Sequence, residues 1–509
     1  MMDHLVIAPI LLPLLTGIVL LLLKPTSLSQ TSLNLRRAMS VAGVAGQLVL
    51  AVLLLDAVRG GEILVYALGN WQAPFGIVLV ADRLAVWMLL VTSLLALFAL
   101  LYALHGTDRD GRHFHVLFQL QLCGLNGAFL TGDLFNLFVF FEILLLASYA
   151  LLLHGGGRQR TRAGLHFVVI NLAGSTLFLF AVGMLYGVTG TLNMADLAVK
   201  VAAADTENIA LIRAAGLLLF AVFALKAALL PLYLWLPAAY ANVSAPVAAL
   251  FAIMTKVGAY SILRVYTLIF GTHAVDAASL IVPWLLPLAL VTLLVGMLGA
   301  MASNTLRQQI AYLVIASVGA LLTAFGLDNS PGIGAGLYYL AHSSFAAAAL
   351  FLLADVIARQ RGEMEDRLHP GLVIANPRLL GALFFVGAVL IVGMPPLSGF
   401  IGKFLILRAA LPHPALPWVM GVVLVGSLLG MIALARSGSL LFYRAQPGQT
   451  PATSPGYYAK ILPIIGLLGL CLALTIWAGA ASDYTRATAE QLLQPSQYIH
   501  AVLGTGGKQ

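Results

Sequence analysis

Runs of about 20 apolar residues follow one another along most of this chain, and they limit its fold more than any other feature. A helix that crosses a bilayer needs roughly 20 such residues. We expect about fourteen of these helices, at residues 4–23, 38–57, 82–104, 114–131, 134–153, 163–186, 209–230, 244–269, 276–300, 305–326, 332–358, 379–407, 416–442 and 457–481. Of the 509 residues, 61% are hydrophobic and 9% are charged, whereas soluble domains carry about 25% charged residues. The sequence therefore predicts an all-α polytopic membrane protein without a long soluble domain.

The segments outside these spans are short. The first apolar run, residues 5–23, is too long for the hydrophobic region of a signal peptide and no small-residue cleavage motif follows it, so we interpret it as the first span. Within residues 60–80, short apolar stretches alternate with turn residues, and this pattern indicates a hairpin. Residues 190–205 indicate a short surface helix. Cys123 and Cys471 lie far apart inside apolar runs, and they predict neither a disulfide nor a metal site.

The distribution of lysine and arginine predicts the orientation of the chain. With the N-terminus outside, the inner loops carry roughly sixteen basic residues and the outer segments roughly eight, which is a clear positive-inside bias. The inner set is Lys24, Arg36, Arg37, Arg109, Arg112, Arg158, Arg160, Arg162, Arg307, Arg359, Arg361, Arg367, Arg378, Arg436, Arg444 and Lys460, and the outer set is Arg59, Arg83, Lys200, Arg213, Arg264, Arg408, Arg486 and Lys508. Both termini are then expected outside. Because most of the formal charge of +8 lies in short membrane loops, it does not indicate nucleic-acid binding.

Three lysines fall inside the apolar runs: Lys226, Lys256 and Lys403. A lysine at the centre of a bilayer helix costs about 2.5–3.5 kcal/mol on insertion scales, so such residues normally face a protein interior or a water-filled cavity. Among the glutamates, only Glu142 falls within a span. One carboxylate cannot neutralise three ammonium groups, so some of these lysines must be neutral, hydrated or share a partner.

Prolines interrupt the helices beside two of these lysines. They are Pro231 and Pro237 after Lys226, and Pro395 and Pro396 before Lys403. A proline inside a helix removes a backbone donor and breaks or kinks the helix, and transporters often build ion sites from broken helices near the bilayer centre. We expect each broken helix to belong to a unit of five helices. The first broken helix enters from outside and the second from inside, so the two units would be related by inversion across the membrane.

Two interpretations apply to Glu142 and Lys226. They could form a static ion pair that fixes helix packing, or they could form a proton site. A carboxylate within ~4–6 Å favours the charged form of a lysine, whereas burial favours the neutral form. Opposed effects of similar size would let Lys226 switch between the two forms. Lys256 could instead extend its ammonium group to the membrane surface, but it lies about twelve residues into its span, which is too deep to do so easily.

His342, in the segment LYYLAHSSFAAAALFLLADV, has two interpretations as well. It could be a structural residue held by hydrogen bonds, or it could relay protons, because histidine titrates close to neutral pH. Ser343 and Ser344 could hold water beside it. His166 lies closer to the inner surface and is the weaker candidate.

Together these residues resemble the antiporter-like membrane subunits shared by respiratory complex I and the Mrp cation/proton antiporters. Glu142 in LFNLFVFFEILLL matches the glutamate of the family's fifth helix. Lys226 and Lys256, on either side of PLYLWLPAAY, match the lysines of its seventh and eighth helices. Lys403, after MPPLSGF, matches the site in its twelfth helix. The resemblance covers about residues 80 to 445.

Within this family the chain is most similar to the branch formed by the D subunits of Mrp antiporters. The opening segment HLVIAPILLPLLTG is typical of that branch. Tyr233 and Tyr240 stand where the complex I relatives usually carry histidines, so a relay role for those histidines is not transferred to this chain. Lys403 is a lysine where one complex I relative has a glutamate.

The resemblance implies a proton-translocating subunit of a multisubunit Na⁺/H⁺ antiporter in a bacterial inner membrane. Its partners would be the other subunits of the complex, protons, the lipid bilayer and Na⁺, and it would need no cofactor, metal site or enzymatic chemistry. Protons would pass Glu142 with Lys226, then Lys256, His342 and Lys403. The expected units are residues 1–110 with the first three helices, 111–270 and 271–445 with the two five-helix repeats, and 446–509 with the last helix and tail.

Three alternatives remain. The chain could be a proton-pumping subunit of complex I or of a membrane-bound hydrogenase, which neighbouring genes would reveal. It could be a structural scaffold for another transporter subunit, in which case replacing the buried lysines with methionine would leave activity intact. A stand-alone carrier is disfavoured, because no span offers a cluster of polar groups that could bind a substrate.

Overall fold

A computed structural model of the protein describes residues 4–23, 30–371, 374–444 and 457–504. Two of the basic residues used to predict orientation, Lys24 and Lys508, lie outside these ranges. The helices are α1 Ala8–Leu22, α2 Gln30–Ala57, α3 Arg83–Ala103, α4 Phe114–Leu130, α5 Leu134–Leu153, α6 Arg158–Thr189, α7 Met194–Ala202, α8 Thr206–Ala227, α9 Trp235–Asn242, α10 Ala245–Phe251, α11 Met254–Leu268, α12 Val282–Ala302, α13 Leu306–Gly326, α14 Ser330–Gln360, α15 Pro377–Val392, α16 Ser398–Ala410, α17 Leu416–Gly438, α18 Tyr457–Ile476, α19 Ala478–Leu492 and α20 Pro495–Leu503. The strands are β1 Leu64–Ala67 and β2 Val78–Ala81.

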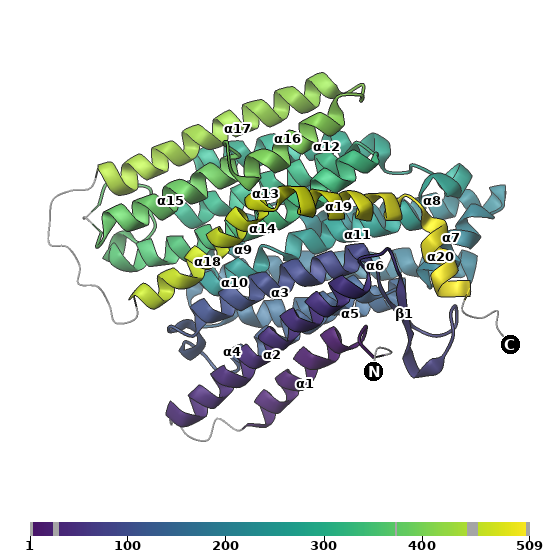
Figure 1. Ribbon diagram of the computed structural model, residues 1–509, viewed down its shortest axis with the longest axis horizontal. Coiled ribbons are helices and arrows are strands. Elements are labelled where there is room, and N and C mark those ends of the chain that lie inside the picture. Colours follow the sequence, from purple (N-terminus) through teal and green to yellow (C-terminus); the bar gives the residue numbers. More distant parts are fainter. Residues whose placement is uncertain (1–3, 24–29, 372–373, 445–456, 505–509) are drawn as a thin grey trace.

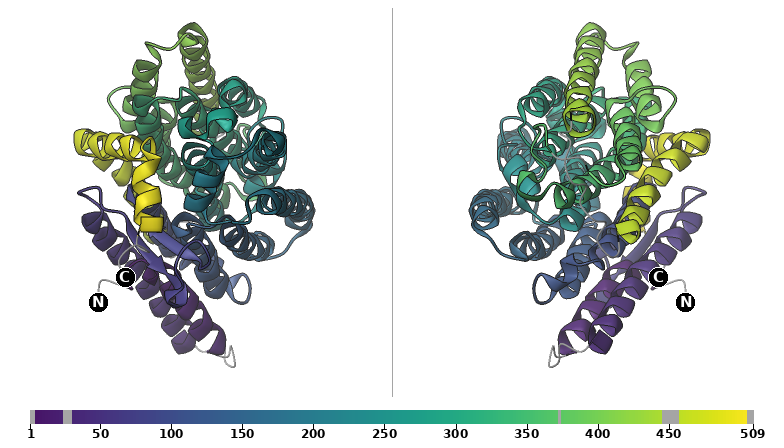
Figure 2. Two further views of the ribbon diagram at one scale, coloured as in Figure 1. Left: turned by 90° about the vertical axis from the view of Figure 1, so that its right-hand side faces the viewer. Right: turned by 90° about the vertical axis from the view of Figure 1, so that its left-hand side faces the viewer.

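Most of the helices run side by side along the longest axis of the molecule (Figure 1), and Figure 2 views them nearly end-on. α1 and α2 lie along one edge of the bundle, and α15 and α17 lie along the opposite edge. The apolar stretches of Ala245–Leu268 and Ser330–Gln360 are buried throughout by other parts of the protein, whereas only about a third of the residues in the apolar stretches of α17 and α18 are buried. Lys256 and His342 therefore stand on helices that other helices shield from lipid.

The expectation of an all-α polytopic membrane protein is confirmed. Among the described residues, eleven helices are long and apolar enough to cross a membrane. Three shorter apolar helices, α1, α4 and α15, accompany them. The count of about fourteen spans would require all of these to cross and stays a prediction.

Two local expectations from the sequence are also confirmed. β1 and β2 pair antiparallel, with Leu64 opposite Ala81, and form the hairpin expected within residues 60–80. α7 is the short helix expected within residues 190–205, and it contacts α20 and the end of α11.

Both proline-containing segments interrupt the helical path. α8 ends at Ala227, and Ala228 adopts a left-handed conformation with φ of 58°. Pro231 lies in the connection to α9, and Pro237 lies in the first turn of α9, where a helix does not need a backbone donor. The second interruption separates α15 from α16 and contains Pro395 and Pro396. Lys226 lies before its break, whereas Lys403 lies after its own, so the two lysines do not occupy equivalent places.

Two helix pairs make the same close contact. Gly124 and Gly127 of α4 face α5, and a Cβ added at Gly124 would lie 2.6 Å from a backbone nitrogen of α5. Gly296 and Gly299 of α12 face α13, where a Cβ at Gly296 would lie 2.5 Å from a backbone nitrogen. In each pair, the first helix therefore approaches the second through a Gly-x-x-Gly step whose first glycine lies against the backbone of its neighbour.

A short backbone bridge accompanies each of these helix pairs. The bridges join Asp133 to Asn193 and Thr305 to Arg367. In the first bridge, Asp133 precedes α5 and Asn193 follows α6. In the second, Thr305 precedes α13 and Arg367 follows α14. The first bridge lies at the hairpin end of the bundle, where Leu79 of β2 pairs with Thr131. The second bridge lies at the opposite end of the bundle, close to the end of α14. This is also where α3 ends, because the hydroxyl of Tyr102, near the end of α3, donates a hydrogen bond to Asp355, near the end of α14.

Arg264, which was assigned from the sequence to the outer set of basic residues, lies in α11, where only 3% of its surface is exposed. A buried ion pair with Asp82, the residue that precedes α3, allows this charge to stay inside the bundle.

Candidate functional site

Lys226 lies in the last turn of α8, with 5% of its surface exposed. Its ammonium nitrogen lies 3.2 Å from the side-chain oxygen of Asn171 on α6, and 5.8 Å from the ring centre of Phe141 on α5. The indole of Trp235 donates to the carbonyl of Leu225, which also accepts from the backbone of Ala228 at the end of α8. The break in α8 thus places the lysine where three helices meet.

Glu142 does not bind Lys226 directly. Both residues are described by the structure, yet no ion pair joins them within 4.0 Å, and the carboxylate oxygen Oε1 of Glu142 is buried without a hydrogen-bond partner among the described residues. The two side chains are still close enough to interact electrostatically. Lys226 therefore makes an amide contact and does not form the static ion pair that was one of the two interpretations, and the carboxylate of Glu142 is a more distant charge.

Lys256 on α11 is completely buried. Its ammonium nitrogen lies 3.4 Å from the hydroxyl oxygen of Ser317 on α13, and this is the one hydrogen bond that its side chain makes among the described residues. The preceding residue, Thr255, has a buried hydroxyl that makes no hydrogen bond to any of the described residues. A cation with one neutral partner at this depth is poorly solvated, since ammonium groups have three donors.

Lys403 and His342 each bond to a residue beside the interruption between α15 and α16. The ammonium group of Lys403 donates to the carbonyl of Val392 at 2.7 Å and to the hydroxyl of Ser427 at 2.9 Å. Val392 is the last residue of α15, so the break frees the carbonyl that the lysine binds. His342 Nδ1 lies 2.9 Å from the hydroxyl of Ser398, at the start of α16.

Gly399 permits this arrangement. A Cβ at this position would lie 2.0 Å from the carbonyl oxygen of Leu390 and 2.9 Å from Nε2 of His342. Nε2 itself is buried and has no partner among the described residues. The histidine is thus held through one ring nitrogen and leaves the other free toward α16.

The structure thus forms separate polar contacts rather than one continuous chain. The contacts are Lys226 with Asn171, Lys256 with Ser317, His342 with Ser398, and Lys403 with Ser427. Within the described part of the chain, every partner of the three lysines is neutral. None of these four partners was singled out from the sequence. The detectable signal for Asn171 was a lone amide within the apolar run of α6, comparable to Glu142 in α5.

An open cavity of about 1060 Å³ lies at the end of the bundle opposite the hairpin. Arginines line it: Arg158, Arg160, Arg162, Arg307 and Arg367. Pro237 and Ala238 of α9 form part of its wall, and His166 borders it as well. The cavity therefore brings a polar surface to the helix that follows the first break.

The carboxylate of Asp108 is anchored at the same end, in the turn after α3. It accepts hydrogen bonds from Arg37 at 2.6 and 2.7 Å, and Nε2 of His115 lies 3.4 Å from it. Burial raises the pKa of this carboxyl group, but the nearby imidazole of His115 and the hydrogen bonds and charge of Arg37 outweigh burial and lower the pKa to about 2. Asp108 is therefore a fixed anion at neutral pH, unlike a group that exchanges protons.

Comparisons with known proteins place this geometry in context. The family described as NADH:quinone oxidoreductase/Mrp antiporter, TM, matches residues 131–430. The D subunit of a probable K(+)/H(+) antiporter of Rhizobium meliloti (strain 1021) is 40% identical, over 99% of this chain and 98% of its own length. The D subunit of the Na(+)/H(+) antiporter of Alkalihalophilus pseudofirmus is 38% identical, over 99% of this chain and 100% of its own.

A solved structure shares the whole fold. A chain of the Mrp complex from Dietzia sp. DQ12-45-1b superimposes with a TM-score of 0.87 and 29% sequence identity, and the match covers 99% of both chains. These similarities confirm the resemblance that Glu142 and the three buried lysines indicated.

Proposed function

Because this chain belongs to the NADH:quinone oxidoreductase/Mrp antiporter family, we propose that it translocates protons within a multisubunit antiporter for a monovalent cation. It is a multi-pass membrane protein and a transporter component rather than an enzyme. The observation that carries the proposal is the burial of three lysines that have only neutral partners among the described residues. Such groups are costly to keep charged and can change protonation without breaking an ion pair.

The proposed route begins at the arginine-lined cavity and reaches Lys226 along α9. Glu142 favours protonation of Lys226 from a distance, and the proton continues through Lys256 and His342 to Lys403. Water molecules must bridge the gaps, because the lysine contacts are separate. Lys403 then opens toward the opposite side. Since one charge moving through 100 mV is worth about 2.3 kcal/mol, a membrane potential can bias these transfers by more than one pKa unit.

The repeated contacts support the two inverted five-helix repeats, at residues 111–270 and 271–445. The Gly-x-x-Gly step and the backbone bridge occur once in each unit, and the two bridges lie at opposite ends of the bundle. In each unit the broken helix comes after the bridge. Two units of opposite direction would give one half-channel from each side of the membrane.

The location follows from the relatives and from the basic residues. We propose a bacterial inner membrane, with both termini on the outer side and the arginine-lined cavity on the inner side. The partners are the other subunits of the antiporter. The names of the two relatives leave Na⁺ and K⁺ as candidates for the exchanged cation.

A proton-pumping subunit of complex I is the second candidate, since the matching family includes such proteins. The relatives that match the full length and are named as D subunits of antiporters favour the antiporter. Neighbouring genes decide between the two, because small antiporter subunits accompany one and quinone-enzyme subunits the other.

Transport in vesicles tests the proposal. We expect Glu142→Ala and Lys226→Ala each to abolish cation/proton exchange while the complex still assembles. Normal exchange by either variant would refute the relay. A purely structural scaffold would instead retain exchange when methionine replaces the buried lysines.

A further inference from the structure

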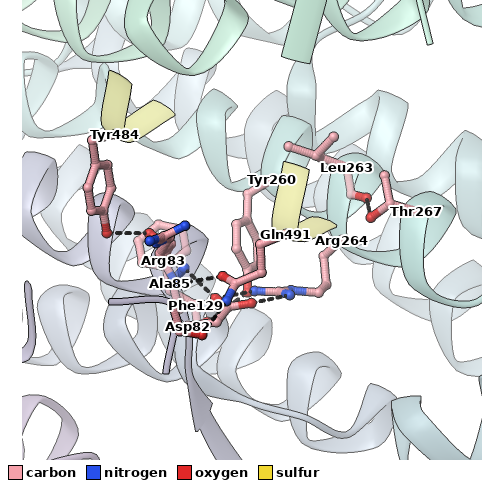
Figure 3. Close-up of polar contacts among 11 residues, drawn as sticks. Asp82, Arg83, Ala85, Phe129, Tyr260, Leu263, Arg264, Thr267, Tyr484 and Gln491 are labelled. Carbon is pink, nitrogen blue, oxygen red and sulfur yellow. Dashed lines mark hydrogen bonds and ion pairs between the residues drawn. The ribbon is translucent and has the colours of Figure 1, made fainter. Parts of the chain in front are cut away.

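A buried ion pair closes the hairpin end of the helix that carries Lys256. Lys256, Tyr260 and Arg264 follow one another at intervals of four residues on α11, so they share one face of the helix. The hydroxyl of Tyr260 donates to the carbonyl of Phe129 at 2.7 Å, and the Nε of Arg264 lies 3.4 Å from the same hydroxyl (Figure 3). A row of polar groups thus leads from the buried lysine to the end of the bundle.

The row ends at Asp82. Two nitrogens of the Arg264 guanidinium donate to the two carboxylate oxygens of Asp82, at 2.6 and 2.7 Å. Asp82 is 1% exposed, and one of its oxygens also accepts from the backbone of Ala85 at the start of α3. The rings of Tyr260 and Tyr498 lie 5.6 and 5.3 Å from the guanidinium carbon. The ion pair is therefore desolvated, and each guanidinium nitrogen of Arg264 has a hydrogen-bond partner.

A second layer of contacts covers the pair on its outer side. The side chain of Gln491 on α19 accepts from the backbone of Arg83 and donates to the carbonyl of Gly61, which precedes the hairpin. The hydroxyl of Tyr484, also on α19, donates to the carbonyl of Arg83 (Figure 3). These contacts hold α3, α19 and the hairpin segment together over the ion pair.

We propose that Arg264 and Asp82 form a barrier that prevents protons at Lys256 from escaping toward the hairpin end. A guanidinium cannot release its proton in a protein, and an arginine placed in a pore excludes protons and cations. Each oxygen of Asp82 already accepts a hydrogen bond from Arg264, and the guanidinium stabilises the charged form of the carboxylate. The inference rests on the proposed function, because a barrier is needed only if Lys256 carries protons.

A merely structural role makes a different prediction. A buried ion pair can serve packing alone, and its presence is weak evidence for stability. A packing clamp would change assembly or thermal stability when it is altered, without opening a path for protons. A proton barrier would leak when its arginine is replaced by a group that can exchange protons, and the leak would depend on Lys256.

Proton leak through liposomes that contain the assembled complex tests the barrier. A pH gradient is imposed without Na⁺ or K⁺, and its decay is followed with a fluorescent dye. We expect Arg264→His to accelerate the decay several-fold, because imidazole can accept and release protons. Arg264→Lys keeps the charge and the pair with Asp82 but can also exchange protons, so we expect a smaller acceleration. Adding Lys256→Met to Arg264→His should restore the slow decay.

Arg486→His is the matched control, since Arg486 lies on α19 with 64% of its side chain exposed and pairs with Asp483 at the surface. It should leave the decay unchanged. A slow decay in assembled Arg264→His overturns the barrier, and so does a fast decay that persists with Lys256→Met. If Arg264→His does not assemble, the decay of the pH gradient is measured with Arg264→Lys, alone and combined with Lys256→Met. A slow decay with Arg264→Lys alone, or a fast decay that persists with Lys256→Met, then overturns the barrier. Failure of the proposed function would appear separately, as normal exchange by Lys226→Ala.

Discussion

The ammonium nitrogen of Lys226 lies 3.2 Å from the side-chain oxygen of Asn171, a neutral group, and forms no ion pair with Glu142 within 4.0 Å. An amide can accept a hydrogen bond from a lysine in either protonation state, because both forms keep a donor. A carboxylate at the same distance would hold the proton more strongly. The neutral contact therefore favours exchange of the proton over its retention.

Asn171→Leu tests this contact. The substitution removes the one hydrogen-bond acceptor that the described residues offer Lys226, and an unsatisfied buried group costs about 1–3 kcal/mol. We expect cation/proton exchange to fall about tenfold, since 1.36 kcal/mol corresponds to a factor of ten in rate. The control is Thr176→Val, because Thr176 is exposed on the same helix and its hydroxyl donates to the carbonyl of Leu172 one turn before it. Wild-type exchange by assembled Asn171→Leu would show that the contact is dispensable.

Gly399→Ala tests the close approach at the second broken helix. The added methyl group would collide with the carbonyl of Leu390 and with His342, and overpacking of this kind costs about 1–3 kcal/mol. We expect a lower melting temperature of the purified complex and impaired exchange, because α16 also carries Lys403. At Gly421 of α17 a methyl group would meet nothing within 4 Å. Gly421→Ala should therefore leave the melting temperature unchanged or raise it slightly, and equal effects at the two positions would refute the packing argument.

Asp108 gives a prediction about pH. Its pKa is lowered from 3.8 to about 2 in the folded protein, which corresponds to about 2 kcal/mol of stability. Because the folded pKa is the lower one, this contribution is complete above pH 4 and is lost as the pH falls from 4 toward 2. Asp108→Asn should therefore destabilise the protein at pH 7, and the difference from wild type should shrink at pH 3. Thermal unfolding at the two pH values measures it, and a difference that does not shrink would contradict the assignment.

Much of the fold could be predicted from the sequence because membrane helices have a strong signal. Apolar length located the long apolar helices, and proline located both interruptions of the helical path. The burial of Arg264 in an ion pair was not predicted, because its partner Asp82 lies 182 residues away and no local pattern reveals such a pair.

The site was predictable only in part. A charged residue in an apolar run is conspicuous, so Glu142 and the lysines were found. Their hydrogen-bond partners are common residues such as Ser317 and Ser427, which apolar helices also carry for other reasons. Which serine meets which lysine depends on how distant helices pack, and one sequence does not contain that information.

The most direct measurement of the central claim is cation-driven proton flux in liposomes that contain the complex with Lys256→Met. Lys256 is completely buried and bonds only to Ser317 among the described residues, so methionine fills a similar volume and removes chiefly the exchangeable proton. We expect the complex to assemble in wild-type yield and the flux to fall to that of protein-free liposomes. A flux equal to that of the wild type would contradict the conclusion that protons pass through the buried lysines.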